Sequence, residues 1–339
     1  MGPTLPKAAP HLVADGRYGA TMTTTSTTTH RPFRFGVQVN ATGRRREWID
    51  LARRVEDAGY ATMTMPDHFS DQLAPVPALQ CAADATTTLR LGALVYDNDY
   101  KHPVVLAKEL ATMDVLSDGR VEIGLGAGWM VSDYEQSGIA YDPPGVRVGR
   151  LIEGLAVIKG ALAPGPFSFQ GEHYTITEYD GLPKPVQTPP PVLIGGGGPR
   201  VLRFAASEAD IVGINATLTS GAVDSSTFES MTAVAVEEKV AIVRAAATAA
   251  GRSDAIEMNI RAFMVFVTDD VASAYDTLAQ FTGAPVDVIR ESPFALVGPP
   301  DKLISDLQER RERWGFSYVI VGQNDIESFA PVVAALAGT

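Results

Sequence analysis

Arg120-Val-Glu-Ile-Gly-Leu-Gly-Ala-Gly-Trp129 is a short apolar stretch that leads into alternating glycines and a tryptophan. The apolar part is typical of a buried strand, and glycines at a strand end let a ligand approach the backbone because no Cβ intervenes. A tryptophan just beyond them can form the wall of a pocket. The same arrangement returns at Pro191-Val-Leu-Ile-Gly-Gly-Gly-Gly198, ahead of a helical pattern. We therefore expect two strands that end in bare backbone and hold one ligand.

Strand and helix patterns alternate along the chain on both sides of these two stretches. Eight strands are predicted from their apolar runs, at residues 33–39, 61–65, 89–95, 121–125, 192–194, 211–214, 258–267 and 318–321. Strict alternation indicates a parallel sheet, and eight units favour a closed barrel over an open doubly wound sheet. The predicted fold is therefore α/β, a (β/α)8 TIM barrel in a single domain over residues 33–339, with insertions at 134–146, 167–188 and 217–232.

Composition limits the classes of partner and site. The chain has 339 residues and a net charge of −12, which excludes the broad basic surface of a nucleic-acid-binding protein. The single cysteine, Cys81, allows no intrachain disulfide or multi-cysteine metal site. No run approaches the ~20 apolar residues of a membrane helix. We expect a cytoplasmic protein with no membrane partner, preceded by a polar, threonine-rich N-terminal extension at residues 1–32 that is disordered.

His68 is the candidate catalytic residue. In a (β/α)8 barrel, ligands bind at the C-terminal ends of the strands, and Asp67-His68 directly follows the second predicted strand. Histidine suits proton transfer near neutral pH, and Asp67 could orient it. The alternative is that both residues only form hydrogen bonds within their loop. No histidine pair has metal-ligand spacing, and neither HExxH nor CxxC occurs, so no metal site is expected.

The four glycines at 195–198 form a candidate phosphate site. Backbone N–H groups and the helix dipole both favour an anion where a glycine-rich loop runs into a helix. The alternative is an ordinary glycine-rich turn. By contrast, Gly124-x-Gly126-x-Gly128 does not fit the dinucleotide fingerprint, because Trp129 stands where its third glycine would fall. A Rossmann fold is therefore not predicted.

Several motifs together resemble a known family. They are Ala58–Tyr60 with Pro66–Phe69, His102–Lys108, Leu110–Arg120, Gly124–Trp129, Pro191–Gly198, Gly298–Lys302 and Tyr318–Val321. On these motifs the chain is similar to the luciferase-like monooxygenase superfamily, in its branch of deazaflavin-dependent (coenzyme F420) oxidoreductases. The resemblance extends from Phe33 nearly to the C-terminus. It implies a (β/α)8 barrel that binds F420, or alternatively FMN, non-covalently at its mouth.

The resemblance also implies roles for individual residues. Asp67 and His68 are expected beside the cofactor ring, and Leu94-Val95 stands where the family has a non-prolyl cis peptide that backs the ring. The remaining expected cofactor contacts are Gly126, Gly128, Trp129 and Asp133, with Gly195, Gly196, Gly197 and Gly198 at the phosphate. Some F420 enzymes carry a glutamate directly after the strand-four glycines. Here Trp129 takes that position, which leaves the proton donor open and speaks against a sugar-phosphate dehydrogenase.

The predicted function is that of an F420-dependent oxidoreductase transferring a hydride between the deazaflavin and a small organic substrate. An alternative is an FMN-dependent luciferase-like monooxygenase that uses reduced flavin and oxygen. A second alternative is a barrel that binds a flavin without catalysis. Lys101, Arg147 or Arg200 could meet an acidic cofactor tail, or could simply lie at the surface. A homodimer is expected, since dimers are usual among proteins of this kind.

Overall fold

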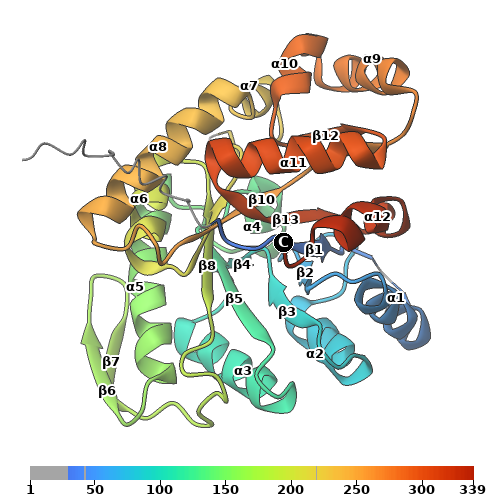
Figure 1. Cartoon of the computed structure of the whole chain (residues 1–339). Coiled ribbons are helices and arrows are strands. Elements are labelled where there is room, and N and C mark those ends of the chain that lie inside the picture. The colour runs from blue at the N-terminus through green and yellow to red at the C-terminus, as the bar shows by residue number, and fades with distance from the viewer. Residues whose placement is uncertain (1–29, 42, 219) are drawn as a thin grey trace, which may run out of the picture.

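A closed parallel barrel forms the centre of the molecule (Figure 1). The computed structural model describes residues 30–41, 43–218 and 220–339. The barrel strands are β1(Arg34–Gln38), β2(Thr62–Met65), β3(Arg90–Ala93), β5(Val121–Gly126), β8(Val192–Gly196), β9(Ile211–Ile214), β10(Glu257–Arg261) and β13(Phe316–Gly322). Their order is β3-β2-β1-β13-β10-β9-β8-β5, and pairing of β3 with β5 closes the ring. The predicted (β/α)8 barrel is confirmed. The predicted N-terminal extension lies outside the described residues apart from residues 30–32.

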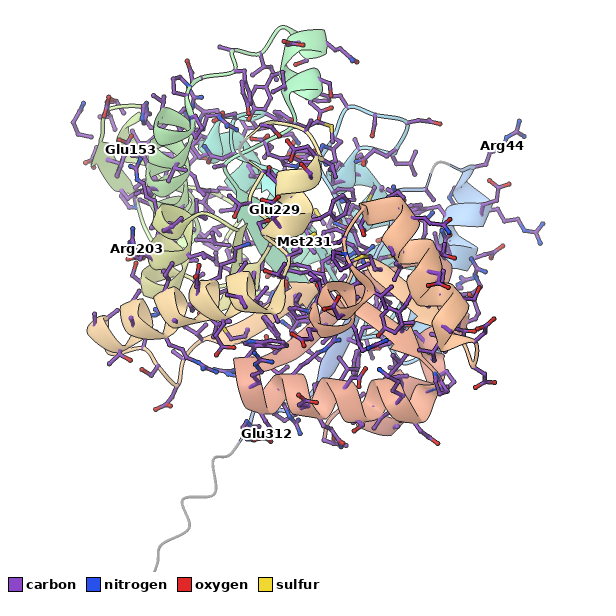
Figure 2. All side chains as sticks on the ribbon, turned by 90° about the horizontal axis from the view of Figure 1, so that it is seen from above. Arg44, Glu153, Arg203, Glu229, Met231 and Glu312 are labelled. Carbon is purple, nitrogen blue, oxygen red and sulfur yellow. The ribbon has the colours of Figure 1, made fainter. Side chains whose placement is uncertain are left out.

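Helices cover the outside of the barrel because each buries one apolar face against the strands. On α1(Arg45–Asp57), Trp48, Leu51 and Val55 are buried at helical spacing. The other covering helices are α2(Pro75–Ala85), α3(Pro103–Leu116), α5(Pro144–Leu162), α6(Pro199–Glu208), α8(Ala233–Ala249), α11(Pro300–Trp314) and α12(Ile326–Leu336). Figure 2 shows charged side chains such as Arg44, Arg203 and Glu312 on the outside of this ring. The strands, covered on both faces, are correspondingly almost wholly buried.

The insertions add small elements at the edges of the barrel. In the predicted insertion at 167–188, β6(Phe167–Gln170) and β7(Thr175–Tyr179) form a hairpin. The helix α4(Val131–Ser137) leads into the insertion at 134–146, and α7(Ser225–Glu229) lies in the insertion at 217–232. A further insertion was not predicted; it comprises β11(Met264–Val267), α9(Val271–Thr282), α10(Val286–Glu291) and β12(Ala295–Gly298). The short elements β4(Tyr96–Asp97) and η1(Gln323–Asp325) complete the fold.

Two predicted strands are wrong in their extent. The expected strand at 258–267 is two strands, because the chain leaves the barrel after Arg261 and β11 pairs in parallel with β12. Likewise the expected strand at 89–95 ends at Ala93, and β4 then pairs with the end of β5. In both cases strand-forming residues continue past the place where the backbone changes partner.

A charged cluster fills the barrel at the N-terminal ends of its strands. Arg34 binds Glu257, with Nη2 and Oε2 2.7 Å apart, and also binds Glu122. Arg90 Nε lies 2.7 Å from the same Glu122 carboxylate, and the Arg34 guanidinium stacks 3.6 Å from the Tyr318 ring centroid. Because these charges are paired in a buried place, the cluster belongs to the stability of the barrel.

Candidate functional site

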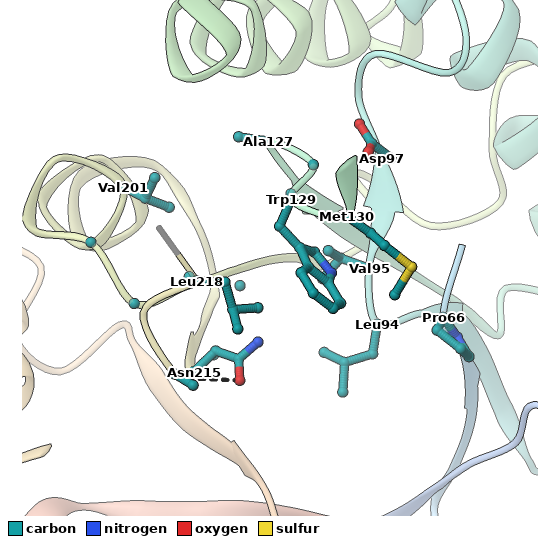
Figure 3. A pocket seen from close by; sticks show the side chains of 18 of the residues that line it. Pro66, Leu94, Val95, Asp97, Ala127, Trp129, Met130, Val201, Asn215 and Leu218 are labelled. Carbon is teal, nitrogen blue, oxygen red and sulfur yellow. Dashed lines mark hydrogen bonds between the residues drawn. The ribbon is translucent and has the colours of Figure 1, made fainter. Parts of the chain in front are cut away.

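A cavity of about 270 Å³ opens at the other end of the barrel, where the strands finish. Its walls come from the residues at or just after the ends of seven strands: Gln38, Pro66–His68, Leu94–Val95, Gly126–Met130, Gly195–Gly198, Ile214–Leu218 and Arg261. Figure 3 shows the Trp129 indole extending between Asn215 and Leu94. The two glycine stretches expected to face one ligand therefore do line one cavity.

Every predicted site residue lies in this cavity or directly behind its wall. Lining residues are Asp67, His68, Leu94, Val95, Gly126, Gly128, Trp129, Gly195, Gly196, Gly197 and Gly198. Asp133 stands behind them, 5% exposed, and reaches the cavity through its hydrogen bond to His68. The Leu94–Val95 peptide bond is cis, as the resemblance implied. The geometry thus gathers the predicted residues, while their roles remain proposals.

The glycines at and just after the end of β5 are required first by neighbouring protein atoms. A Cβ on Gly126 would overlap the Val95 side chain. One on Gly128, whose φ is +71°, would overlap the hydroxyl of Tyr134. Only glycine adopts this φ without strain and leaves room for these groups. Close packing around the end of β5, as well as ligand access, explains these glycines.

The second glycine loop ends in open space at a helix N-terminus. A Cβ on Gly198 would have no atom within 4 Å, whereas one on Gly197 would overlap the Ala216 carbonyl. Gly198 is the N-cap of α6, and the first N–H groups of a helix have no acceptor within it. Together with the helix dipole, this geometry suits an anion at Gly198.

His68 is oriented from behind by Asp133. Its Nδ1 lies 2.6 Å from Asp133 Oδ2, and the Tyr100 hydroxyl donates to the same oxygen at 3.1 Å. Trp129 packs edge-on against the imidazole, with ring centroids 5.7 Å apart. The predicted orienting partner was Asp67, but Asp67 instead accepts from the Asp97 backbone N–H at 3.2 Å. With Nδ1 engaged, Nε2 is the ring nitrogen left for a bound molecule among the described groups.

Two carboxyl groups in the cavity wall are buried enough to resist ionisation. Burial raises the pKa of Asp67. Burial and the nearby Asp99 raise the pKa of Asp97 to about 7, although the Tyr134 hydroxyl donates to it at 3.0 Å. Asp97 lies two residues beyond the strand expected at 89–95 and was not among the predicted site residues. The charge of this wall therefore changes close to neutral pH.

The three basic residues considered for an acidic cofactor tail have other contacts. Lys101 pairs with Glu109 at 2.6 Å, and Arg200 donates to the Gly145 carbonyl at 2.7 Å. Arg147 lines the cavity, but it is 4% exposed and donates to the carbonyls of Ala127, Gly128 and Asp142 and to the Tyr141 hydroxyl. Arg147 thus holds the loop after β5 in place.

Some cavity residues were not predicted from the sequence. Arg261 and Phe263 were concealed inside the overlong strand at 258–267. Asn215 and Leu218 follow β9 directly, so the end of that strand was an available signal. Lys239 supports this loop from outside, donating to the carbonyls of Asn215 and Ser230 at 2.8 Å each.

Two features are absent from the described residues, a cluster of metal-ligating side chains and a membrane-spanning helix. Within residues 30–41, 43–218 and 220–339, no group of three or more His, Cys, Asp or Glu residues could hold a metal ion. None of the helices in that same part of the chain has the length and apolar character needed to span a bilayer.

Comparison of the sequence with known families and proteins gives consistent matches. The sequence model of the family described as luciferase-like monooxygenase matches residues 28–315. An F420-dependent glucose-6-phosphate dehydrogenase of Amycolatopsis mediterranei is 30% identical over 176 residues, covering 49% of this chain and 52% of that protein. An uncharacterised protein of Mycobacterium tuberculosis is 31% identical over 182 residues, covering 47% and 62%. The matched regions thus span about half to three fifths of these relatives.

Solved structures share the fold at low sequence identity. An F420-dependent tetrahydromethanopterin reductase from Methanopyrus kandleri superposes with a TM-score of 0.73 at 21% identity, covering 90% of this chain and 100% of that one. A long-chain alkane monooxygenase has a TM-score of 0.71 at 16% identity, covering 90% and 92%. These similarities support the barrel and do not distinguish between cofactors.

Proposed function

This chain belongs to the luciferase-like monooxygenase family, and we propose that it is an F420-dependent oxidoreductase acting on a small organic substrate. Membership confirms the resemblance found in the motifs, and the enzymes of this family are oxidoreductases and monooxygenases. The observation that carries the proposal is the convergence of both glycine stretches, the Leu94–Val95 peptide and His68 on one cavity. The F420-dependent dehydrogenase among the relatives favours F420 over FMN.

The cavity fits a flat ring joined to a phosphate. Gly195–Gly198 and the first turn of α6 would hold the phosphate, where Gly198 leaves open space. Leu94–Val95 and Trp129 provide apolar walls for a ring, and Asp67, Gly126 and Gly128 lie along the same cavity. The bound deazaflavin would supply the hydride-transfer chemistry. The protein's part is to place the ring against the substrate and to keep water out.

His68 would handle the proton that accompanies hydride transfer. Because Asp133 engages Nδ1, the imidazole presents Nε2 to the cavity. In the proposed role Nε2 donates a proton to the reduced substrate, or accepts one in the opposite direction. Asp133 would hold the imidazole in the orientation that presents Nε2, and Tyr100 holds the Asp133 carboxylate in place.

Cofactor titration tests the proposal. Apoprotein is titrated with F420 and, separately, with FMN, followed by the visible absorbance of each cofactor, and oxygen uptake is recorded with the reduced forms. We expect F420 to bind at least tenfold more tightly than FMN and reduced F420 to cause no oxygen uptake. Tighter FMN binding with oxygen consumption would instead identify a monooxygenase. Binding of a cofactor without turnover of any substrate in a panel of carbonyls and alcohols would indicate a non-catalytic carrier.

A further inference from the structure

Arg261, the last residue of β10, lies in the cavity wall with most of its N–H groups unused. Its Nε donates to Gln38 Oε1 at 3.1 Å, and Gln38 Nε2 donates to the Leu94 carbonyl at 2.9 Å. Nη1 is buried without a hydrogen-bond partner, and the side-chain hydrogen bond that Arg261 donates within the described residues comes from Nε. The guanidinium is therefore fixed at its Nε edge while its two η nitrogens lack acceptors from the described part of the chain.

The unused donors belong to a charged group. Burial lowers the pKa of Arg261 to about 10, which still leaves it protonated at neutral pH. Asp325 attracts it, but no ion pair joins the two within the described chain. A buried cationic donor without an acceptor is destabilising, so a ligand oxygen that supplies the acceptor binds with a gain in free energy.

Comparison with the other arginine of the cavity limits the charge of the ligand. Arg147 already donates to three backbone carbonyls and one hydroxyl. Among the described residues that line the cavity, Arg261 is thus the arginine with free donors. One carboxylate carries the single negative charge that one guanidinium balances.

Apolar surface adjoins the same guanidinium. The Phe263 ring lies 5.0 Å from the Arg261 guanidinium carbon and is stacked on Phe294 with ring centroids 6.0 Å apart. Phe263 is nevertheless 48% exposed and lines the cavity, as do Leu94 and Leu218. A cation beside a half-exposed aromatic ring suits a ligand that has one charged end and one apolar end.

Building on the proposed function, we propose that the substrate is an organic acid with an apolar body. Its carboxylate would bind Nη2 of Arg261, and its apolar part would lie against Phe263. Arg261 is then a specificity-determining residue, which selects the charged substrate over a neutral one of the same shape. The same carboxylate chemistry also occurs in an acidic cofactor tail, so the experiment has to separate substrate from cofactor.

Calorimetric titration with matched acids and amides tests this assignment. The probes are benzoate with benzamide and hexanoate with hexanamide, titrated into apoprotein and into protein loaded with F420 or FMN. We expect the wild type to prefer each acid over its amide by roughly tenfold to a hundredfold. Arg261→Gln should reduce that preference to less than about threefold, and Arg261→Lys should retain part of it, because lysine keeps the charge but loses the planar fork.

The controls separate this inference from the proposed function. Cofactor affinity in both variants should stay within about threefold of wild type, and thermal unfolding confirms that they fold. A wild type that binds acid and amide equally overturns the inference even if no variant folds. A loss of F420 affinity in Arg261→Gln as large as the loss of acid affinity also overturns it, because Arg261 would then serve the cofactor. If neither cofactor binds, the proposed function fails, while the apoprotein titration still decides the inference.

Discussion

His68 enters the cavity with one ring nitrogen already engaged, since Nδ1 lies 2.6 Å from Asp133 Oδ2. A group held in this way can exchange a proton through Nε2 without first having to reorient. This preorganisation depends on Asp133, which is buried on α4 and also holds the Tyr100 hydroxyl. In the proposed role, proton transfer would therefore depend on the three side chains together.

Replacing His68 tests that role. We expect His68→Asn to lower kcat by roughly 10²- to 10⁴-fold with any substrate that the wild type turns over, because the proton donor is lost. Cofactor affinity should change less than about threefold. Asp133→Asn, which keeps the shape but removes the carboxylate that holds Nδ1, should lower kcat less than His68→Asn does. Steady-state kinetics across pH measures both, and wild-type turnover in His68→Asn would exclude the proposed role.

At the residue scale the sequence indicated the catalytic candidate but not its partner. His68 was found because polar residues after a predicted strand gather at one end of a barrel. Asp67 was chosen as its partner only because it is adjacent in sequence. Asp133 lies 65 residues away on a seven-residue helix, too short for its periodicity to be recognised. Contacts between an insertion and a strand end depend on how the insertion folds back, which a local pattern does not contain.

At the scale of elements, the turn between β8 and α6 combines two glycines with different constraints. Gly197 has no room for a side chain, because a Cβ would overlap the Ala216 carbonyl. Gly198 has open space in front of it and a φ of −85°, which any residue can adopt. The two positions therefore separate the effect of packing from the effect of the ligand.

Substitution at Gly198 tests the phosphate site. Gly198→Asp should raise the dissociation constant of the cofactor by roughly tenfold or more, because a carboxylate would face the phosphate at the helix N-terminus. Gly198→Ala is the matched control and should bind within about threefold of wild type. Absorbance titration measures both constants. Equal affinity in these two variants would show that the phosphate lies elsewhere.

The sequence predicted best those elements that pair within one sheet. The strand predicted at 211–214 is β9 with the same bounds, because a short apolar run that is buried throughout marks it. Strand 258–267 failed because strand-forming residues continue from β10 towards β11, while the two strands pair in different sheets. That error also concealed Arg261, since a residue placed inside a strand is not considered at a cavity rim.

On the scale of the whole molecule, the two ends of the barrel have separate tasks. The Arg34, Arg90, Glu122 and Glu257 cluster fills the N-terminal end, and the cavity occupies the C-terminal end. Between them lie the apolar strand interiors. A change at the N-terminal end of the barrel should therefore alter stability without altering the ligand site.

Replacing Glu122 tests this division. Glu122→Gln leaves Arg90 without its carboxylate and Arg34 with one of two, so we expect the free energy of unfolding to fall by about 3–5 kcal/mol. Glu327→Gln is the control, because its pair with Arg54 is largely exposed and should contribute no more than about 1 kcal/mol. Denaturant unfolding measures both. Cofactor affinity in the folded Glu122→Gln protein should equal that of wild type, and a large loss of affinity would contradict the separation.

Trp129 gives this protein a built-in optical reporter. The chain has three tryptophans, of which Trp48 and Trp314 are each 3% exposed in the helical layer. Trp129 is half-buried, and its indole extends into the cavity (Figure 3). Because the emission of an indole responds to its immediate surroundings, molecules entering the barrel mouth would change the fluorescence of this one residue above a steady background from the other two. Occupancy could thus be followed in real time, without a label and before any turnover is known.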